Sequence, residues 1–506
     1  MTATLRPTTI EAPLTLGQIA ARFDLALPDQ AAHDIVITGI THDSRAVRPG
    51  DLFAALPGEH THGAKFADQA RSLGAVAVLT DPGPLGSADR TGVDLHGLPL
   101  LVAEDPRGVL GAVSAAVYGD PAQALTVIGI TGTNGKTTTA ALLAAGLTAG
   151  GRTVGVIGTT GVRIGGGILP SARTTPEAPD LHALLAVMRE RGVNVVVMEV
   201  SSHALVLGRV DGLVYDVAIF TQLSQDHLDF HGTMEDYFAA KASLFTPERA
   251  RRAVIGIDSM WGRRLADTCQ IPATTYALRQ DAQVTCREIV EERGSQTLLV
   301  DDGSGVTHRV AVGLPGEFNA ANGLAAWTTL RLLEVPEAIA DVGMADVHVP
   351  GRMEVVDAGQ PFVVLVDYAH TPDAVERVLT AVSPTTGGRR IAVLGCGGDR
   401  DREKRPHMGG VAALRSDVLI VTDDNPRTED PAAIRAAMIA GTAGLEGDIR
   451  EIGDRREAIA AAIAEAQPGD VVLILGKGHE PGQEIAGTVH PFSDREAALA
   501  ALGASA

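Results

Sequence analysis

The hydrophobic positions of the chain gather in short runs that are almost continuously apolar and rich in Val and Ile. Between residues 125 and 475 such runs lie at 125–130, 193–200, 214–220, 362–366, 391–394, 418–421 and 471–475. Strands that are buried on both faces have this pattern, and such strands form parallel sheets. Stretches with helical spacing lie between them, for example at 138–148 and 432–440. The alternation predicts two doubly wound α/β units.

Chain length and punctuation predict three domains. A chain of 506 residues is long enough for about three. Residues 1–123 form the first unit, a smaller α/β domain with short apolar runs at 35–40 and 75–80. The second unit covers 124–347, and the third covers 348–506, beginning at a Pro-Gly linker at 350–351. The 57 glycines and 3% aromatic residues suit α/β units with tight turns and small-residue packing.

Charge and cysteine content narrow the class of protein. A net charge of −20 repels phosphate backbones, which excludes nucleic acid as a partner but not a small nucleotide. Cys269, Cys286 and Cys396 are an odd, sparse set that forms neither a disulfide framework nor a metal motif. The first residues lack an apolar signal core, and no run reaches the ~18 apolar residues of a membrane span. We therefore expect a cytoplasmic protein with no membrane partner.

Nearly every polar cluster follows one of the apolar runs, where open α/β sheets bind ligands. The run at 125–130 leads into TGTNGKTTT at 131–139 and then into a helical stretch. Glycine-loop amides and the helix N-terminus can cradle phosphates, with Lys136 on the terminal phosphates and the Thr137 hydroxyl near Mg²⁺. One departure leaves an ordinary turn as the alternative, because the glycine expected at 130 is Ile130 and glycine falls at 129.

Two further runs end in possible metal ligands. Glu199 closes the run at 193–200, and a lone buried carboxylate is costly unless it is paired or binds a metal. Asp226 and His227 follow the run at 214–220. Alternatives stay open: a half-exposed Glu at a strand end, and a structural His, since Mg²⁺ prefers oxygen. Lys241, in an amphipathic helical stretch, is by pattern alone a surface lysine whose stem packs on apolar neighbours.

With these segments in view, the chain resembles the Mur ligases along essentially its whole length, and most closely their MurE branch. The resemblance rests on TGTNGKTTT (131–139), RTTPEAPD (173–180), MEVSSHAL (198–205), DHLDFHGT (226–233), YFAAKASLF (237–245), PGRME (350–354), DYAHTPD (367–373), GCGGDRDREKRP (395–406), DNPR (424–427) and GKGHE (476–480). It implies an N-terminal UDP-substrate domain, a central ATPase domain and a C-terminal Rossmann-like domain that binds the amino acid.

The resemblance also implies a reaction of peptidoglycan precursor synthesis in the cytoplasm. ATP phosphorylates the free carboxylate of UDP-N-acetylmuramoyl-L-alanyl-D-glutamate. An amine of meso-diaminopimelate attacks the acyl phosphate, which gives amide, ADP and phosphate. Mg²⁺ and Lys136 offset the charge on the transferred phosphoryl group. A monomer is expected.

Site residues are carried over by matching positions. The implied catalytic and Mg²⁺ set is Lys136, Thr137, Glu199, His227 and Lys241, the last as a carbamate formed from CO₂. The implied ATP contacts are Gly132, Thr133, Asn134, Gly135, Lys136, Thr137, Thr138, Asn322, Arg352 and Asp367. The implied UDP-substrate contacts are His42, Ser44, Thr174, Thr175, Ser201 and Arg209. The implied diaminopimelate contacts are Arg400, Asp424, Asn425, Pro426, Arg427, Gly476 and Glu480.

Arg427 and Glu480 carry the expected choice of amino acid. A guanidinium can hold the second carboxylate of diaminopimelate bidentately, and Glu480 can take the distal ammonium. Lysine would then leave Arg427 unpaired. Taken alone, an Arg after Asn-Pro is usually a solvated turn residue.

Several other functions compete with this reading. They are a lysine- or ornithine-adding member of the same branch, MurF, a folylpolyglutamate synthetase, and a nucleotide-driven switch without ligation. DNPR argues against the lysine type, and THDSR (41–45) with TTPEAPD (174–180) argues for a UDP-muramoyl dipeptide over a folate. A switch would not need a third anion at Lys241.

Overall fold

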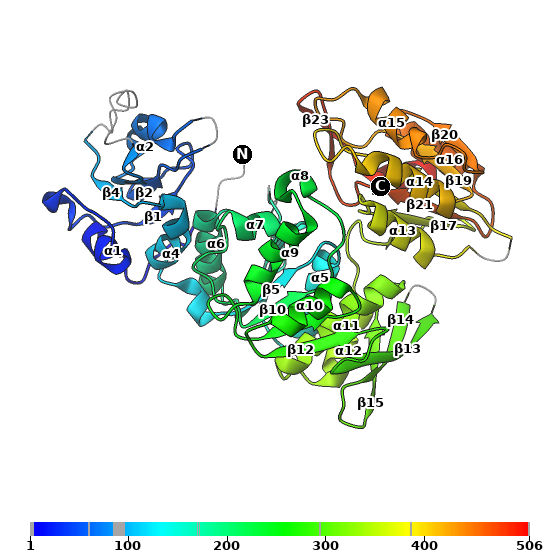
Figure 1. Cartoon of the computed structure of the whole chain (residues 1–506), viewed down its shortest axis with the longest axis horizontal. Coiled ribbons are helices and arrows are strands. Elements are labelled where there is room, and N and C mark those ends of the chain that lie inside the picture. Colours follow the sequence, from blue (N-terminus) through cyan, green and yellow to red (C-terminus); the bar gives the residue numbers. More distant parts are fainter. Residues whose placement is uncertain are drawn as a thin grey trace.

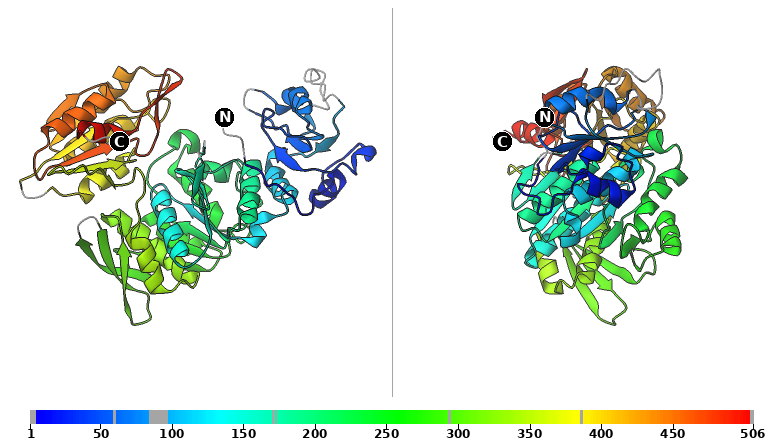
Figure 2. Two further views of the ribbon diagram at one scale, coloured as in Figure 1. Left: turned by 180° about the vertical axis from the view of Figure 1, so that it is seen from behind. Right: turned by 90° about the vertical axis from the view of Figure 1, so that its left-hand side faces the viewer.

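The protein folds into three parts that follow one another along the chain, each with its own main sheet (Figure 1). The computed structural model describes residues 5–58, 61–83, 97–169, 171, 173–292, 295–384 and 387–503. Figure 2 shows that the first and third parts stand on the same side of the central part. Among the described residues, no helix combines the length and the apolar character needed to cross a bilayer.

The first part is built on a four-stranded parallel sheet. Its strands pair in the order β1 (Gly39–Thr41), β2 (Asp51–Ala54), β3 (Ala77–Thr80) and β4 (Leu100–Val102). The helices are α1 (Leu16–Phe23), α2 (Ala67–Ser72) and α4 (Pro106–Val117). Thr15 and Gln18 form a capping box that satisfies the first amides of α1. Leu16 and Ile19 of α1 then pack on Leu52 and Leu79 of the sheet, so this part has its own core.

The central sheet has eleven strands, and its middle is parallel. Its order is β15 (Thr307–Val312), β14 (Ser295–Asp301), β13 (Val284–Glu292), β12 (Ala273–Ala277), β11 (Ala253–Gly256), β10 (Val217–Phe220), β5 (Thr126–Thr131), β9 (Val195–Glu199), β6 (Val154–Gly158), β7 (Gly161–Ile164) and β8 (Gly167–Leu169). Strands from β13 to β6 pair in parallel, and antiparallel pairs extend both edges. The runs at 125–130, 193–200 and 214–220 are thus confirmed as parallel strands.

Helices cover both faces of this sheet. They are α5 (Lys136–Ala149), α6 (Ala178–Glu190), α7 (Ser202–Val206), α8 (Leu228–His231), α9 (Met234–Ala242), α10 (Met260–Thr268), α11 (Glu317–Leu332) and α12 (Glu337–Ala345). One core joins α5 and α11 to the sheet through Leu142, Leu143 and Trp327. The other joins α6 and α9 to the opposite face through Leu181 and Tyr237. A sheet buried on both faces explains why its strands are uniformly apolar.

The third part is a second doubly wound unit. Its sheet runs β16 (Glu354–Val355), β17 (Val363–Asp367), β21 (Val471–Leu475), β18 (Arg390–Leu394), β19 (Val418–Val421) and β20 (Asp448–Glu451), parallel except for β16. The helices are α13 (Pro372–Ala381), α14 (Lys404–Arg415), α15 (Pro431–Ala440), α16 (Arg455–Glu465) and α17 (Asp494–Ala501). A hairpin of β22 (Gly482–Ile485) and β23 (Thr488–Pro491) precedes α17. The predicted α/β class is confirmed for both later parts.

Short 3-10 helices complete the fold, namely η1 (Gln30–Ala32), η2 (Gly63–Phe66), η3 (Pro121–Ala124) and η4 (Ser243–Phe245). The predicted polar clusters lie at the carboxyl ends of parallel strands. The glycine loop follows β5, Glu199 ends β9, Asp367 ends β17, and Gly476 follows β21. This arrangement fits the general placement of ligand sites in open α/β sheets.

Candidate active site

The glycine loop at 132–135 joins β5 to α5, as predicted. Gly132 (φ 147°) and Gly135 (φ 90°) have backbone conformations that favour glycine, and a Cβ at Gly132 would collide with the Thr221 hydroxyl. The Lys136 Nζ donates to the carbonyls of Gly132 (2.9 Å) and Thr133 (2.9 Å). The loop thus leads directly into the N-terminus of α5, which is a favourable place for a phosphate group.

Glu199 lies beside this loop and is buried, with 1% of its surface exposed. Its carboxylate accepts hydrogen bonds from the Thr137 hydroxyl (3.0 Å), the Thr159 amide (2.9 Å) and the Thr159 hydroxyl (3.0 Å). The alternative of a half-exposed strand-end Glu is therefore wrong. All three donors are neutral groups, so a buried anion and a hydroxyl lie together where a hard cation would fit.

Lys241 is buried as well, with 1% exposed, so the pattern-based reading as a surface lysine is wrong. The reason is that α9 turns Tyr237, Phe238 and Lys241 inward. The Lys241 Nζ donates to the Gly132 carbonyl (2.9 Å) and lies 4.6 Å from the centre of the Tyr237 ring. Burial, reinforced by the nearby charge of Lys136, lowers the pKa of Lys241 well below its usual 10.5.

His227 and Asp226 face each other at the same end of the sheet. The His227 Nε2 lies 3.4 Å from an Asp226 carboxylate oxygen, and His227 has φ 53° in the left-handed region. Burial lowers the pKa of His227 to about 4, although Asp226 opposes this shift. The ring is therefore neutral at pH 7 and can offer a lone pair. Within the described ranges, no three His, Cys, Asp or Glu side chains are close enough to hold a metal. The predicted Mg²⁺ set therefore depends on Lys241 becoming an anion.

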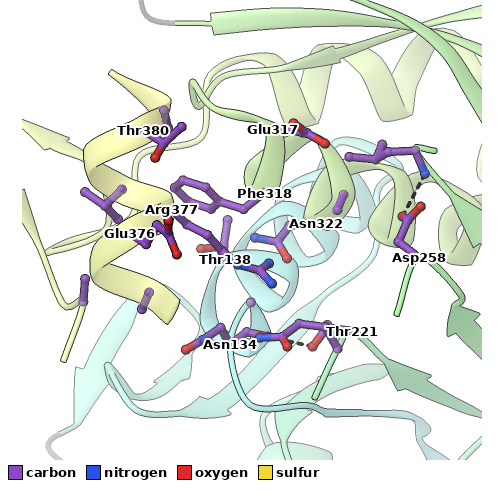
Figure 3. A pocket seen from close by; sticks show the side chains of 18 of the residues that line it. Asn134, Thr138, Thr221, Asp258, Glu317, Phe318, Asn322, Glu376, Arg377 and Thr380 are labelled. Atoms are coloured by element: carbon purple, nitrogen blue, oxygen red, sulfur yellow. Dashed lines mark hydrogen bonds between the residues drawn. The ribbon is translucent and has the colours of Figure 1, made fainter. Parts of the chain in front are cut away.

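A cavity of about 690 Å³ opens beside the glycine loop, between the central and third parts (Figure 3). Many of the predicted nucleotide contacts line it, namely Asn134, Gly135, Thr138, Asn322, Arg352 and Asp367. Phe318 of α11 and Arg377 of α13 form further walls that the sequence had not indicated. An aromatic ring and side chains from two domains suit the base and sugar of a nucleotide.

Arg352 connects the third part to the first turn of α5, and Asp367 holds the backbone next to Arg352. The Arg352 Nη2 donates to the Thr137 hydroxyl (3.3 Å), and its guanidinium lies 4.6 Å from the Tyr368 ring centre. Asp367 accepts the amides of Met353 (2.7 Å) and Ala369 (2.8 Å). Burial raises the pKa of Asp367, although Arg352 opposes the shift.

A second cavity, of about 470 Å³, is lined mostly by the first part and also by Arg173 and Asp180 of the central part. His42 and Ser44 line it, and the Ser44 hydroxyl donates to Gln69 Oε1 (2.7 Å). Arg173 also lines it and bonds to Glu177 (2.9 Å). Of the predicted UDP-substrate residues, only His42 and Ser44 line this cavity.

The other four predicted substrate residues lie between this cavity and Glu199. Arg209 pairs with Glu177 (2.8 Å), and the Thr174 hydroxyl lies 3.2 Å from that of Thr159. The Thr175 hydroxyl donates to the Glu199 carbonyl (2.9 Å) and accepts the Ser201 amide (3.1 Å). Thr174, Thr175 and Ser201 therefore form a path toward Glu199 and the glycine loop, and Arg209 is tied through Glu177 to Arg173 at the cavity. Glu177, which pairs with Arg173 and Arg209, had not been identified from the sequence.

The predicted amino-acid residues other than Arg400 lie where β19 and β21 end. The Asn425 side chain donates to Glu480 (2.8 Å), and a Cβ at Gly476 (φ 115°) would lie 2.6 Å from an Asp424 carboxylate oxygen. Asn425 is followed by Pro426, whose carbonyl accepts the Glu429 amide (3.1 Å). Arg400 is exposed and donates to the Asp399 carbonyl (3.2 Å), so its side chain bonds within its own loop.

The Arg427 side chain already has partners within the protein. Its Nη1 donates to the Gly398 carbonyl (2.6 Å), and its Nε lies 3.4 Å from Glu484. A substrate without a second carboxylate would therefore not leave Arg427 unpaired, and the penalty against lysine is smaller than expected.

The predicted diaminopimelate residues lie in the segments 424–427 and 476–480, which we call the amino-acid loops, and contacts join these loops to the residues around the glycine loop. The Tyr368 hydroxyl donates to Glu480 (3.3 Å), while its ring packs on Arg352. The His479 Nε2 lies 3.2 Å from the Thr159 carbonyl. Gly351, where the chain enters the third part, lies so close to the backbone of Gly478 and His479 that a Cβ would collide with it.

A buried ion pair supports the amino-acid loops from below. Arg455 and Asp494 are both 0% exposed and pair bidentately, at 2.7 and 2.8 Å. The Arg455 Nη2 also donates to the Leu475 carbonyl (2.9 Å), and Nη1 lies 3.5 Å from the Asp423 carbonyl. These two carbonyls directly precede Gly476 and Asp424, so Arg455 fixes the start of both loops.

Fold and site together define a three-domain α/β protein with a glycine loop between a parallel strand and a helix, and with a cavity lined by two of the domains. Three family profiles match consecutive stretches: "Mur ligase family, catalytic domain" at 36–105, "Mur ligase middle domain" at 130–330 and "Mur ligase, glutamate ligase domain" at 351–478. The chain belongs to the Mur ligase family.

Similar proteins cover almost the whole chain. The UDP-N-acetylmuramoyl-L-alanyl-D-glutamate–2,6-diaminopimelate ligase of Streptomyces coelicolor is 51% identical over 498 residues, 97% of this chain and 96% of that protein. The ligase of the same name from Corynebacterium glutamicum is 47% identical over 487 residues, 94% of each chain. A solved structure of a ligase of this name has a TM-score of 0.68 at 33% identity, covering 97% of this chain and 99% of that one. The MurF ligase of Thermotoga maritima, solved with ADP, shares the fold with a TM-score of 0.62 at 20% identity, covering 87% of this chain and 94% of that one.

Proposed function

We propose that this protein is the ATP-dependent ligase that adds meso-diaminopimelate to UDP-N-acetylmuramoyl-L-alanyl-D-glutamate in peptidoglycan precursor synthesis. The observation that carries the proposal is the continuous line of contacts from Glu480 through Tyr368 and Arg352 to Thr137 and Glu199. It connects amino-acid loops to a phosphate loop, as a reaction joining an activated acid to an amine requires. The relatives named for this reaction support the proposal.

In this scheme each of the three parts binds one substrate. Residues 1–123 hold the UDP end of the muramoyl dipeptide in the cavity at His42 and Ser44. Residues 124–347 hold ATP on the glycine loop, and residues 348–506 bring the amino acid. The path through Thr175 and Ser201 leads the D-glutamyl carboxylate toward the glycine loop.

The chemistry then follows from charge. An oxygen of the glutamyl carboxylate attacks the γ-phosphorus, and ADP leaves. The amine attacks the acyl carbon, phosphate leaves, and the nitrogen loses a proton. Lys136 offsets charge on the transferred group, and Arg352, against Thr137, orients the nucleotide. Mg²⁺, when bound, supplies further positive charge, and Glu199, the Thr137 hydroxyl, His227 and Lys241 are the residues that would hold it.

Lys241 fits this role as a carbamate. A free ammonium beside Lys136 and a metal would be repelled, but the lowered pKa of Lys241 leaves a neutral amine. A neutral amine can add CO₂ and lose a proton, which gives an anionic oxygen ligand. The three unpaired cysteines and the use of ATP suit a cytoplasmic enzyme.

One assay tests the proposal. The purified protein receives ATP, Mg²⁺ and the UDP-muramoyl dipeptide, and then diaminopimelate, lysine, ornithine or D-Ala-D-Ala. Of the four amines, only diaminopimelate should give fast phosphate release. Arg427→Ala should lower kcat/KM for diaminopimelate by roughly 100-fold and for lysine far less. Equal release with every amine, or no release with diaminopimelate, would overturn the proposal.

A further inference from the structure

A lysine with no role in the scheme above lies at the centre of the amino-acid loops. Lys477 follows Gly476, and its side chain is 0% exposed. Its Nζ donates to Asn425 Oδ1 (3.0 Å) and to Glu480 Oε2 (3.1 Å), and lies 4.0 Å from Asp424 Oδ1. One buried ammonium thus touches three side chains that are expected to bind the substrate.

These contacts fix the orientation of Asn425 and Glu480. Asn425 Oδ1 accepts both Lys477 Nζ and the Glu484 amide (3.0 Å), so its Nδ2 must face Glu480 (2.8 Å). Burial raises the pKa of Glu480, but Lys477 and the hydrogen bond from Asn425 outweigh it and bring the pKa below the ordinary value. Glu480 is therefore an ionised carboxylate that already has one cation beside it.

We infer that Lys477 is a specificity-determining residue that disfavours amino acids whose side chain ends in an ammonium alone. The inference rests on the proposed function. The far end of diaminopimelate carries an ammonium and a carboxylate, so its repulsion from Lys477 is offset by attraction. The far end of lysine or ornithine carries only the positive charge, so its repulsion from Lys477 is not offset in this way.

The selectivity depends on a difference of one charge and not on the total charge of the pocket. Replacing Lys477 by a neutral residue makes the pocket more negative by one unit, which favours a cationic end over a zwitterionic one. For charges ~8 Å apart at an effective dielectric constant of ~20, the preference should shift by roughly 30-fold. Arg427 attracts the second carboxylate, whereas Lys477 opposes a lone ammonium, so the two act by separate means.

The test compares kcat/KM for diaminopimelate and for lysine in two variants of the full-length enzyme. Lys477→Met removes the charge, and Lys477→Gln removes it while keeping a hydrogen-bond donor for Glu480. Both should lower the diaminopimelate-to-lysine ratio by at least about tenfold, with KM for ATP unchanged. Lost orientation of Glu480 alone would weaken both amino acids together and leave the ratio as it was.

The matched control is the double variant Arg455→Met, Asp494→Leu. It removes another buried cation beneath these loops together with its counter-charge, so the net charge stays the same. Its ratio should match that of the unaltered enzyme. A ratio that falls equally in the control, or that does not fall in either Lys477 variant, would overturn the inference. An unaltered enzyme that does not use diaminopimelate would instead refute the proposed function.

Discussion

The ion pair of Arg455 and Asp494 should be costly to break on one side and nearly free to replace as a whole. Both side chains are 0% exposed, and both oxygens of Asp494 accept from the guanidinium. Asp494→Asn keeps the shape and one acceptor but leaves the charge of Arg455 uncompensated. Removing one partner of such a pair typically costs about 3–5 kcal/mol, whereas replacing both by apolar residues is often neutral or stabilising.

The size of the effect can be stated for the third part alone. A domain of 150–250 residues loses roughly 2–4 °C in its midpoint per kcal/mol, so Asp494→Asn should lower the midpoint by roughly 10 °C. Arg455→Met with Asp494→Leu should lower it by no more than about 3 °C. The double variant still loses the bonds to Leu475 and Asp423, so KM for the amino acid should rise while KM for ATP stays the same.

The assay must distinguish the parts of the chain, because a multidomain protein does not unfold as one unit. Both tryptophans, Trp261 and Trp327, lie in the central part, so their fluorescence should be the same in the variants and the parent. Amide hydrogen exchange in β19 and β21 should accelerate in Asp494→Asn. A double variant as unstable as Asp494→Asn would refute the reasoning, because lost packing and not a stranded charge would then explain the effect.

Three more predictions follow from buried groups. Lys241→Ala should abolish ligation, and small carboxylates such as formate should restore part of it; no restoration at any concentration would refute the carbamate. Glu199→Gln should raise the Mg²⁺ concentration for half-maximal rate by about 10-fold or more, while a thermal midpoint unchanged within about 2 °C would separate this from misfolding. His182 is fully buried, and burial lowers its pKa to about 4. It therefore stays neutral in the folded chain at a pH where the unfolded chain, below about pH 6.5, already binds a proton. Stability should therefore fall as pH drops from about 6.5 to about 4, by up to roughly 3 kcal/mol, and His182→Gln should flatten this slope in urea titrations.

Parallel strands were the easiest elements to predict. Strands such as β5, β9 and β21 are buried along almost their full length, so their apolar runs stand out without any tertiary knowledge. The antiparallel strands β14 (Ser295–Asp301) and β15 (Thr307–Val312) were missed because their burial alternates, so that polar residues break each run. The apolar run at 35–40 shows the opposite error, because most of it is not a strand. Strand β1 includes only the last two residues of that run.

Site residues were predictable where a loop follows directly from a strand. The glycine loop and Glu199 needed only their position after an apolar run. Lys241 could not be judged in this way, since its burial depends on how α9 packs. Glu177, Thr159 and Lys477 were missed because each also contacts a residue far away in the sequence, namely Arg209, Glu199 and Asn425, and no local spacing reveals those contacts.

Gly351 has a consequence for how the third part can move. The chain crosses from the central part to the third part here, and its backbone rests directly on that of Gly478 and His479. Rotation of the third part about this crossing would displace the backbone of Gly478 and His479, which directly precedes Glu480. Binding of the incoming amine and rotation of the third part should therefore be coupled, and a bulkier residue at 351 should impair both.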